Sequence, residues 1–108
     1  MQFIQLLRLN EYYRNDHNWT DESNAIIESH FNYLKNLYEL GIISYVGKTD
    51  LEVSDIHNTG VVILQSDSYE SATALANSDP AVQAGLMNFQ IFPFHTVLPW
   101  KNKNLSSP

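Results

Sequence analysis

The sequence predicts a single α+β domain built on a four-stranded antiparallel sheet, and three observations support this class. The chain has 108 residues, which is the length of one compact domain. Four short segments are rich in β-branched and aromatic residues, as strands are, and two longer segments carry helix-capping signals. The order of these segments is β-α-β-β-α-β, which is the split βαβ or ferredoxin-like pattern.

The four strands are bounded by polar and glycine-containing segments. We expect them at residues 3–9, 42–46, 60–65 and 89–98. The polar stretch 10–19 predicts a loop. The connection 48–59 is longer than an ordinary hairpin loop, which makes it a candidate functional loop.

Capping residues predict the helices. The first helix is expected over residues 20–40, between an N-cap threonine and a glycine at the C′ position. The second helix is expected over residues 68–77, starting from an N-cap serine. Asp79-Pro80 then starts another helical turn, which closes at Gly85.

The strands are apolar on both faces. Two helices can cover only one face of a four-stranded sheet. When the other face is exposed to solvent, apolar and polar residues alternate along each strand. Here Val61 and Ile63 point to one face, while Val62 and Leu64 point to the other. An uncovered apolar face usually marks an interface. We therefore expect a homodimer in which two sheets pack face to face, forming a dimeric α+β barrel.

Composition excludes several function classes. The chain has 12 acidic and 6 basic residues, and this net charge of -6 argues against nucleic acid or an anionic membrane surface as a partner. There is no cysteine, which excludes disulfides, thiol nucleophiles and thiolate metal sites. No membrane span or signal peptide is evident, so we expect a soluble, cytoplasmic protein. We expect one domain over residues 1–98 and a flexible tail over 99–108.

His30 is the first candidate for chemistry, because it interrupts the apolar face of the first helix. On a helical wheel it falls inside the arc formed by Ile26, Ile27, Phe31, Leu34, Leu37 and Tyr38. One interpretation is a core histidine satisfied by a backbone carbonyl. The other is a partly buried general base or acid. No second histidine lies three or four residues away, so we expect no metal site.

Asp79 is the expected partner of His30. In a βαββαβ layout the loops 10–19 and 48–59 and the end of the second helix meet at one rim of the sheet, and Asp79 lies there. A carboxylate that accepts from one imidazole nitrogen fixes the tautomer and leaves the other nitrogen as a base. The alternative is that Asp79 only caps the helical turn.

Other residues at the same rim could bind a substrate. Arg8 and Lys48 could hold an anionic group, although a salt bridge at the strand end and a solvated loop charge are the respective alternatives. Trp19, with Tyr12 and Tyr13, could wall a pocket for an aromatic compound or could serve only in packing. The remaining histidines lie elsewhere and are interpreted as incidental: His17, His57 and His95.

Several motifs resemble the YCII-related (YciI-like) family over roughly residues 1 to 98. They are His30-Phe31-Asn32-Tyr33-Leu34, Leu40-Gly41, Gly47-Lys48-Thr49, the stretch 76–85 around Asp79-Pro80, and Phe92-Pro93-Phe94. The resemblance implies a dimeric α+β barrel and identifies His30 and Asp79 as an active-site dyad. Members of that family are mostly proteins of unestablished reaction. This chain departs from the family pattern at Thr59, Lys48 and Asn88, where many members carry glycine, proline and arginine.

Three hypotheses follow. The first is a small enzyme without a cofactor, in which His30 is a base, Asp79 orients it, and Arg8 or Lys48 holds an anionic substrate. Elimination or isomerisation of a small aromatic or oxyanionic metabolite is the reaction class that a His–Asp pair without a nucleophile can perform. The second hypothesis is a dimeric module that only binds a ligand. The third is a structural dimer with a satisfied core histidine.

Overall fold

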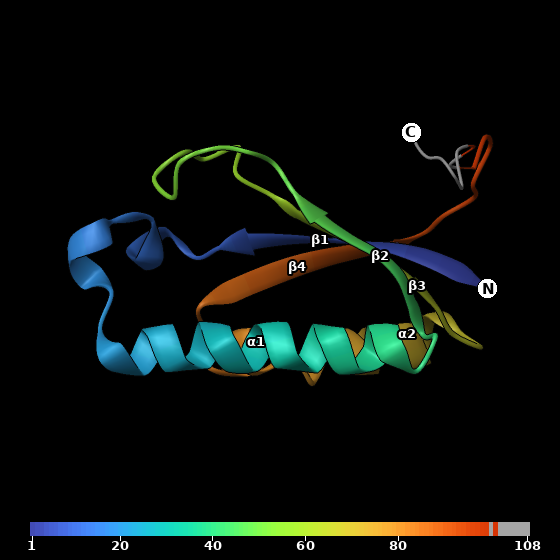
Figure 1. The fold of residues 1–108 in the computed structure, drawn as a ribbon, viewed down its shortest axis with the longest axis horizontal. Helices are drawn as coiled ribbons and strands as arrows, with labels where there is room; N and C mark the ends of the chain where they lie inside the picture. The colour runs from blue at the N-terminus through green and yellow to red at the C-terminus, as the bar shows by residue number, and fades with distance from the viewer. Residues whose placement is uncertain (100, 102–108) are drawn as a thin grey trace.

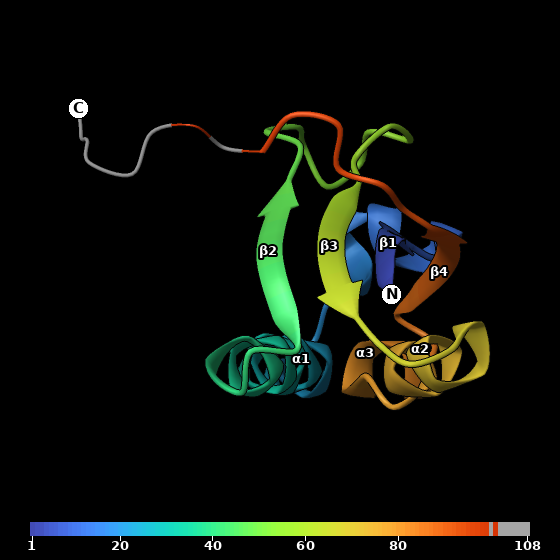
Figure 2. The same cartoon turned by 90° about the vertical axis from the view of Figure 1, so that its right-hand side faces the viewer.

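The computed structural model describes residues 1–99 and 101. It confirms the ferredoxin-like α+β class (Figure 1), with one antiparallel sheet in the order β2-β3-β1-β4 (Figure 2). The strands are β1 Gln2–Leu9, β2 Ile43–Lys48, β3 Gly60–Gln65 and β4 Met87–Pro93. The helices are α1 Asp21–Glu39, α2 Tyr69–Asn77 and α3 Pro80–Gln83, with 3-10 turns η1 Glu11–Arg14 and η2 Asp16–Asn18. All three α-helices lie on one side of the sheet (Figure 2).

The predicted helix boundaries are confirmed by their caps. Thr20 accepts from the backbone N–H of Ser23, whose hydroxyl accepts from the N–H of Thr20, so the two residues form a capping box. At the other end of α1, Gly41 has φ +81°, a left-handed conformation that glycine adopts without a steric penalty. These local interactions fix where α1 begins and ends.

The largest differences from the sequence predictions lie in the 10–19 stretch and at the ends of two strands. The stretch 10–19 is not an irregular loop but holds both 3-10 turns, the second of which is capped by the Asn15 side chain. Strand β2 continues through Gly47 to Lys48. Strand β4 ends at Pro93 rather than residue 98, because its partner β1 begins at Gln2, and the Phe94 N–H makes the last bond, at 2.9 Å, to the Gln2 carbonyl. Most of the predicted flexible tail, residues 100 and 102–108, lies outside the described residues.

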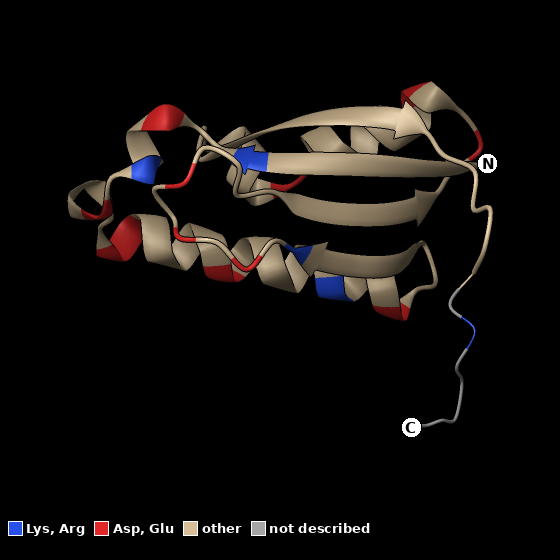
Figure 3. Ribbon diagram, turned by 90° about the horizontal axis from the view of Figure 1, so that it is seen from above, with Lys and Arg blue, Asp and Glu red and all other residues tan. Residues whose placement is uncertain are grey.

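The two faces of the sheet differ in cover. The face under the helices carries the core, whose buried members include Phe3, Leu7, Leu34, Leu37, Ile43, Val62, Leu64 and Ile91. On the opposite face, which we call the open face, Ile4, Leu6, Val61 and Ile63 are half-buried, while Tyr45 and Phe92 are exposed. Seen from above, the strands are free of charge along most of their length (Figure 3). The centre of the open face is therefore apolar, as predicted, and uncovered within one chain.

Among the described residues, no helix is both long enough and apolar enough to cross a membrane.

Candidate functional site

A buried histidine–aspartate pair lies between α1 and α3. The Nδ1 atom of His30 is 2.7 Å from Oδ2 of Asp79 and 2.9 Å from Oδ1. His30 is 4% exposed and Asp79 is 1% exposed. Within residues 1–99 this is the one pair of oppositely charged groups in salt-bridge contact. The structure thus brings together the two residues that the sequence singled out.

Asp79 is fixed by more than its contact with His30. It is the N-cap of α3, where its Oδ1 accepts from the backbone N–H of Ala81 at 2.9 Å, and Pro80 occupies the first helical position. The Asp79 carboxylate therefore has both of the roles considered for it, since it caps α3 and also pairs with His30. A carboxylate fixed in this way selects the tautomer with the proton on Nδ1, which leaves Nε2 free to accept a proton.

His30 also lines a pocket of about 390 Å³, a size within the range of small-molecule sites. The pocket lies between α1 and the end of the sheet formed by β1, β2 and β3. Its apolar wall includes Leu7, Leu9, Trp19, Ile27, Phe31, Leu34, Val46, Val53, Val62 and Met87. Its polar groups are few, and they are His30, Lys48, Asn58 and Thr59. Such a site suits a mostly apolar ligand with a small number of oriented polar atoms.

Both candidate loops border this pocket. Trp19 contributes from the β1–α1 connection, and its indole N–H donates to the Tyr13 carbonyl at 2.8 Å. The ring of Tyr13 packs edge-on against Trp19, with ring centroids 5.8 Å apart. From the β2–β3 connection, Thr59 donates its N–H to the Thr49 hydroxyl at 2.9 Å, which closes the base of that loop. Trp19 therefore both packs locally and walls the pocket.

The two predicted anion-holding residues are separated by the sheet. Lys48 lines the pocket with His30, and its Nζ donates to the Thr49 carbonyl at 2.7 Å. Arg8 is exposed and lies on the open face, where it pairs in register with Asn88. Together with Arg14 it lines a separate small cavity. Successive residues of a strand point to opposite faces, so the position of Arg8 directly after the core residue Leu7 directs it away from His30.

The other predictions for α1 and for the remaining histidines have mixed outcomes. Phe31 and Tyr38 belong to the predicted apolar arc, but they are 56% and 57% exposed. They lie at the flank of α1 beside the edge strand β2, where no further element covers them. His17, His57 and His95 are exposed and do not line the pocket. Within the described ranges, no three histidine or acidic side chains gather closely enough to hold a metal ion.

Sequence reasoning missed two polar residues behind the pair. The Tyr33 hydroxyl donates to the Leu75 carbonyl at 2.8 Å. Burial raises the pKa of Tyr33, a hydrogen bond with Ser78 lowers it, and the charge of Asp79 raises it further. Gln5 is 3% exposed, and its amide nitrogen has no hydrogen-bond partner among the described residues. The available signal was the alternation Phe3, Gln5, Leu7, which places a glutamine on the core face of β1.

The fold and this site together define the chain as a ferredoxin-like α+β protein with a buried His–Asp pair beside an apolar pocket. A family model for the YCII-related domain matches residues 5–95. The chain belongs to this family, which confirms the resemblance described above.

Comparison with solved structures gives the same fold. One match is 5-chloro-2-hydroxyhydroquinone dehydrochlorinase (TftG) from Burkholderia phenoliruptrix, in complex with 2,5-dihydroxybenzoquinone. It has a TM-score of 0.60 and 17% sequence identity, and the alignment covers 95% of this chain and 96% of that one. A comparison with curated protein sequences finds no match.

Proposed function

We propose that this protein is an enzyme that removes a proton from a small ring-shaped substrate and thereby drives an elimination or isomerisation. One observation carries the proposal. His30 lines a pocket of ligand size, while its Nδ1 is held by the buried carboxylate of Asp79. In this proposal His30 Nε2 is the general base, and Asp79 orients the ring and stabilises the imidazolium that forms.

Lys48 is the proposed anion-binding residue. A substrate that loses a proton to His30 acquires negative charge, which a nearby ammonium group stabilises. Lys48 is on the pocket wall, and one hydrogen bond to the neighbouring Thr49 carbonyl holds its exposed side chain. Arg8 lies on the other face of the sheet, so it has no part in this step.

The pocket favours a hydroxylated aromatic or quinoid ring as the substrate class. Its wall contains the rings of Trp19 and Phe31 and is otherwise largely aliphatic. The similar solved structure binds 2,5-dihydroxybenzoquinone, and its protein is a dehydrochlorinase. In the step that we propose, His30 takes a proton from the ring substrate and the remaining electron pair forms a π bond. The leaving group departs with its own bonding pair, so that one H–X is lost and no oxidant is needed.

We further propose that the open face is covered by a second copy of the chain. Ile4, Leu6, Val61 and Ile63 form an apolar patch at the centre of that face, and they pair across adjacent strands. A symmetric dimer that packs this patch against itself would remove it from water.

Turnover of a ring substrate tests the proposed reaction. Purified protein is incubated with 5-chloro-2-hydroxyhydroquinone, and chloride release is measured for the wild type, for His30→Ala and for the exposed-histidine control His57→Ala. We expect wild-type activity from the control and a loss of roughly 10²–10⁴-fold in His30→Ala. Binding of 2,5-dihydroxybenzoquinone should survive that substitution. Equal chloride release from all three proteins would contradict the proposal, and binding without turnover in the wild type would favour a ligand-binding module.

A further inference from the structure

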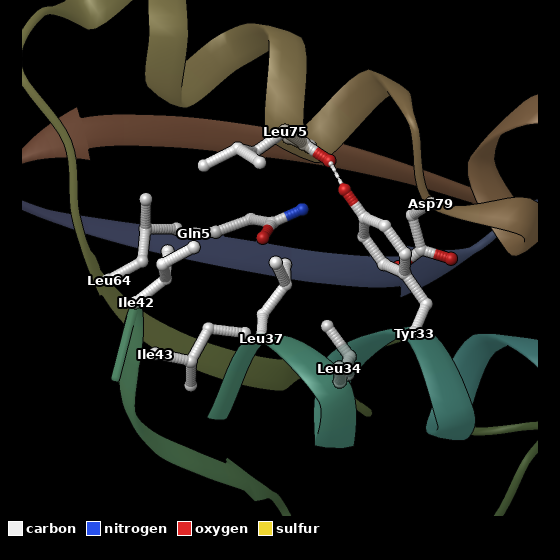
Figure 4. Close-up of a pocket in the computed structure, with 10 residues that line it drawn as sticks. Gln5, Tyr33, Leu34, Leu37, Ile42, Ile43, Leu64, Leu75 and Asp79 are labelled. Carbon is white, nitrogen blue, oxygen red and sulfur yellow. Dashed lines mark hydrogen bonds between the residues drawn. The ribbon is translucent and has the colours of Figure 1, made fainter. Parts of the chain in front are cut away.

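A buried polar amide lies directly behind the His–Asp pair. Gln5 projects from β1 into the core, and its Nε2 has no hydrogen-bond partner among the described residues. The close-up shows its amide nitrogen directed toward Tyr33 and Asp79 (Figure 4). Because an unpaired buried amide loses its hydrogen bonds to water and regains none, it costs free energy unless something else binds it.

The space around this amide has the size of one water molecule. A cavity of about 10 Å³ is lined by three polar residues, Gln5, Tyr33 and Asp79, and otherwise by apolar side chains such as Leu34 and Leu75. A buried water needs at least about 10–15 Å³ of such volume and between two and four polar partners. The cavity meets the lower limit of the volume, and three polar residues line it, so its size and lining fit one water.

We propose that a single buried water occupies this cavity and links the Gln5 amide to the Asp79 carboxylate. In this arrangement the water accepts from Gln5 Nε2 and donates to a carboxylate oxygen of Asp79 and to the Tyr33 hydroxyl. The Tyr33 oxygen has a free lone pair for this, because its own proton is donated to the Leu75 carbonyl. Gln5 is thereby a positioning residue, since it acts on the proposed base His30 only through Asp79. This role rests on the proposed function.

The link has a defined electrostatic consequence. A donor to the Asp79 carboxylate stabilises negative charge there, and it does so most when His30 is neutral and the carboxylate is uncompensated. The link therefore favours the unprotonated ring, which is the form that a base requires. The ionisable groups around Asp79 are His30 and Tyr33 from α1, and Lys48 of β2 lines the larger pocket with His30.

Gln5→Met tests this inference, because methionine has a similar length but donates no hydrogen bond. The matched control is Thr73→Val, since the Thr73 hydroxyl is also buried without a partner in the part of the chain that the structure describes, but it does not line this cavity. The titration of the His30 ring is followed by NMR in both variants and in the wild type. In Gln5→Met we expect the titration midpoint to rise by on the order of half a pH unit, and in Thr73→Val we expect no change. An unchanged midpoint in folded Gln5→Met would overturn the proposal.

A second measurement uses the unmodified protein, so the test does not depend on the folding of a variant. Cross-relaxation between water and the Gln5 side-chain amide protons should be detected in the wild type, with the sign that a long-lived bound water gives. If no such signal is found, the proposal is wrong. Neither measurement needs substrate, so the water link and the proposed reaction are tested independently. The link can be present in a protein that shows no turnover, and turnover can be present in a protein that lacks the link.

Discussion

The helix-covered face of the sheet and its open face are made by the same four strands, yet the covered face borders the candidate site and the open face does not. Leu7 on the covered face is 4% exposed and borders the pocket, whereas its neighbour Leu6 is half-buried on the open face. Lys48 and Arg8 are separated in the same way. The difference teaches that strand parity determines which residues can take part in chemistry and which are available for assembly.

The largest expected contrast is in stability. Leu7→Ala removes a core side chain and should lower the free energy of unfolding by about 2–5 kcal/mol. Leu6→Ala removes the same atoms from the open face and should cost less than half as much in dilute protein. Urea denaturation of both variants measures the difference. Equal losses would show that Leu6 is buried as fully as Leu7 under these conditions, which would contradict an uncovered open face in dilute protein.

Self-association is the next property that the open face should control. Ile63→Lys places a charge at the centre of the apolar patch, next to its cross-strand partner Ile4. We expect the dimer to dissociate, because an unpaired charge in an apolar interface is strongly unfavourable. Sedimentation analysis should then give half the wild-type mass, while Leu40→Lys, at the exposed end of α1, should leave the mass unchanged. A wild-type protein that is monomeric at all concentrations would refute the proposed dimer.

A side chain that fills part of the pocket should weaken ligand binding without unfolding the protein. A Cβ added at Gly60 would be in ordinary contact with Leu7, at 3.5 Å, and the rest of a valine side chain would enter the pocket. Gly60→Val should therefore keep the fold but weaken binding of 2,5-dihydroxybenzoquinone by roughly tenfold or more. Gly47 also borders the pocket, but in the control Gly47→Ala the added methyl projects to the open face, where the Tyr45 hydroxyl at 2.8 Å must move aside, so binding should change less. Calorimetric titration distinguishes the two, and similar affinities in both variants would argue against this pocket as the ligand site.

The smallest expected effect concerns alkaline pH. Burial raises the pKa of Tyr33 above its usual value of about 10, so the unfolded chain loses this proton at a lower pH than the folded protein. The associated stability is fully present below about pH 10 and is lost as the pH rises through the folded-state value. Tyr33→Phe should reduce this loss in urea unfolding above pH 10, and Tyr45→Phe on the open face should not. An identical pH dependence in both variants would contradict the assignment to Tyr33.

Much of the fold could be predicted, because its signals are local. Thr20 and Gly41 determine where α1 begins and ends, and the apolar runs of β1 and β3 identify the central strands. The predicted end of β4 is wrong, since apolar residues continue past Pro93 while the partner strand β1, which begins at Gln2, has no further strand residue to pair with them. The 3-10 turns at residues 11–18 depend on contacts such as that of Trp19 with Tyr13, which composition does not reveal.

The candidate site was predictable where one helix face or the topology decided it. His30 stood out on an apolar arc, and the strand order placed Asp79 at the same rim. The roles of Arg8 and Gln5 depended on strand parity. Gln5 and Arg8 are only three residues apart, and composition does not predict that the glutamine is buried and the arginine exposed. Their positions follow once the register of β1 with β3 and β4 is known.

The central claim is that the Asp79 carboxylate prepares His30 as a base, and an NMR titration of the His30 ring in the wild type and in Asp79→Asn tests it most directly. Asparagine is also a good N-cap residue, so the variant should keep α3. The account predicts that the titration midpoint falls by roughly one pH unit or more in Asp79→Asn, because an uncharged amide no longer stabilises the imidazolium. Superimposable titration curves from two folded proteins would contradict it, and Asp79 would then be a helix cap alone.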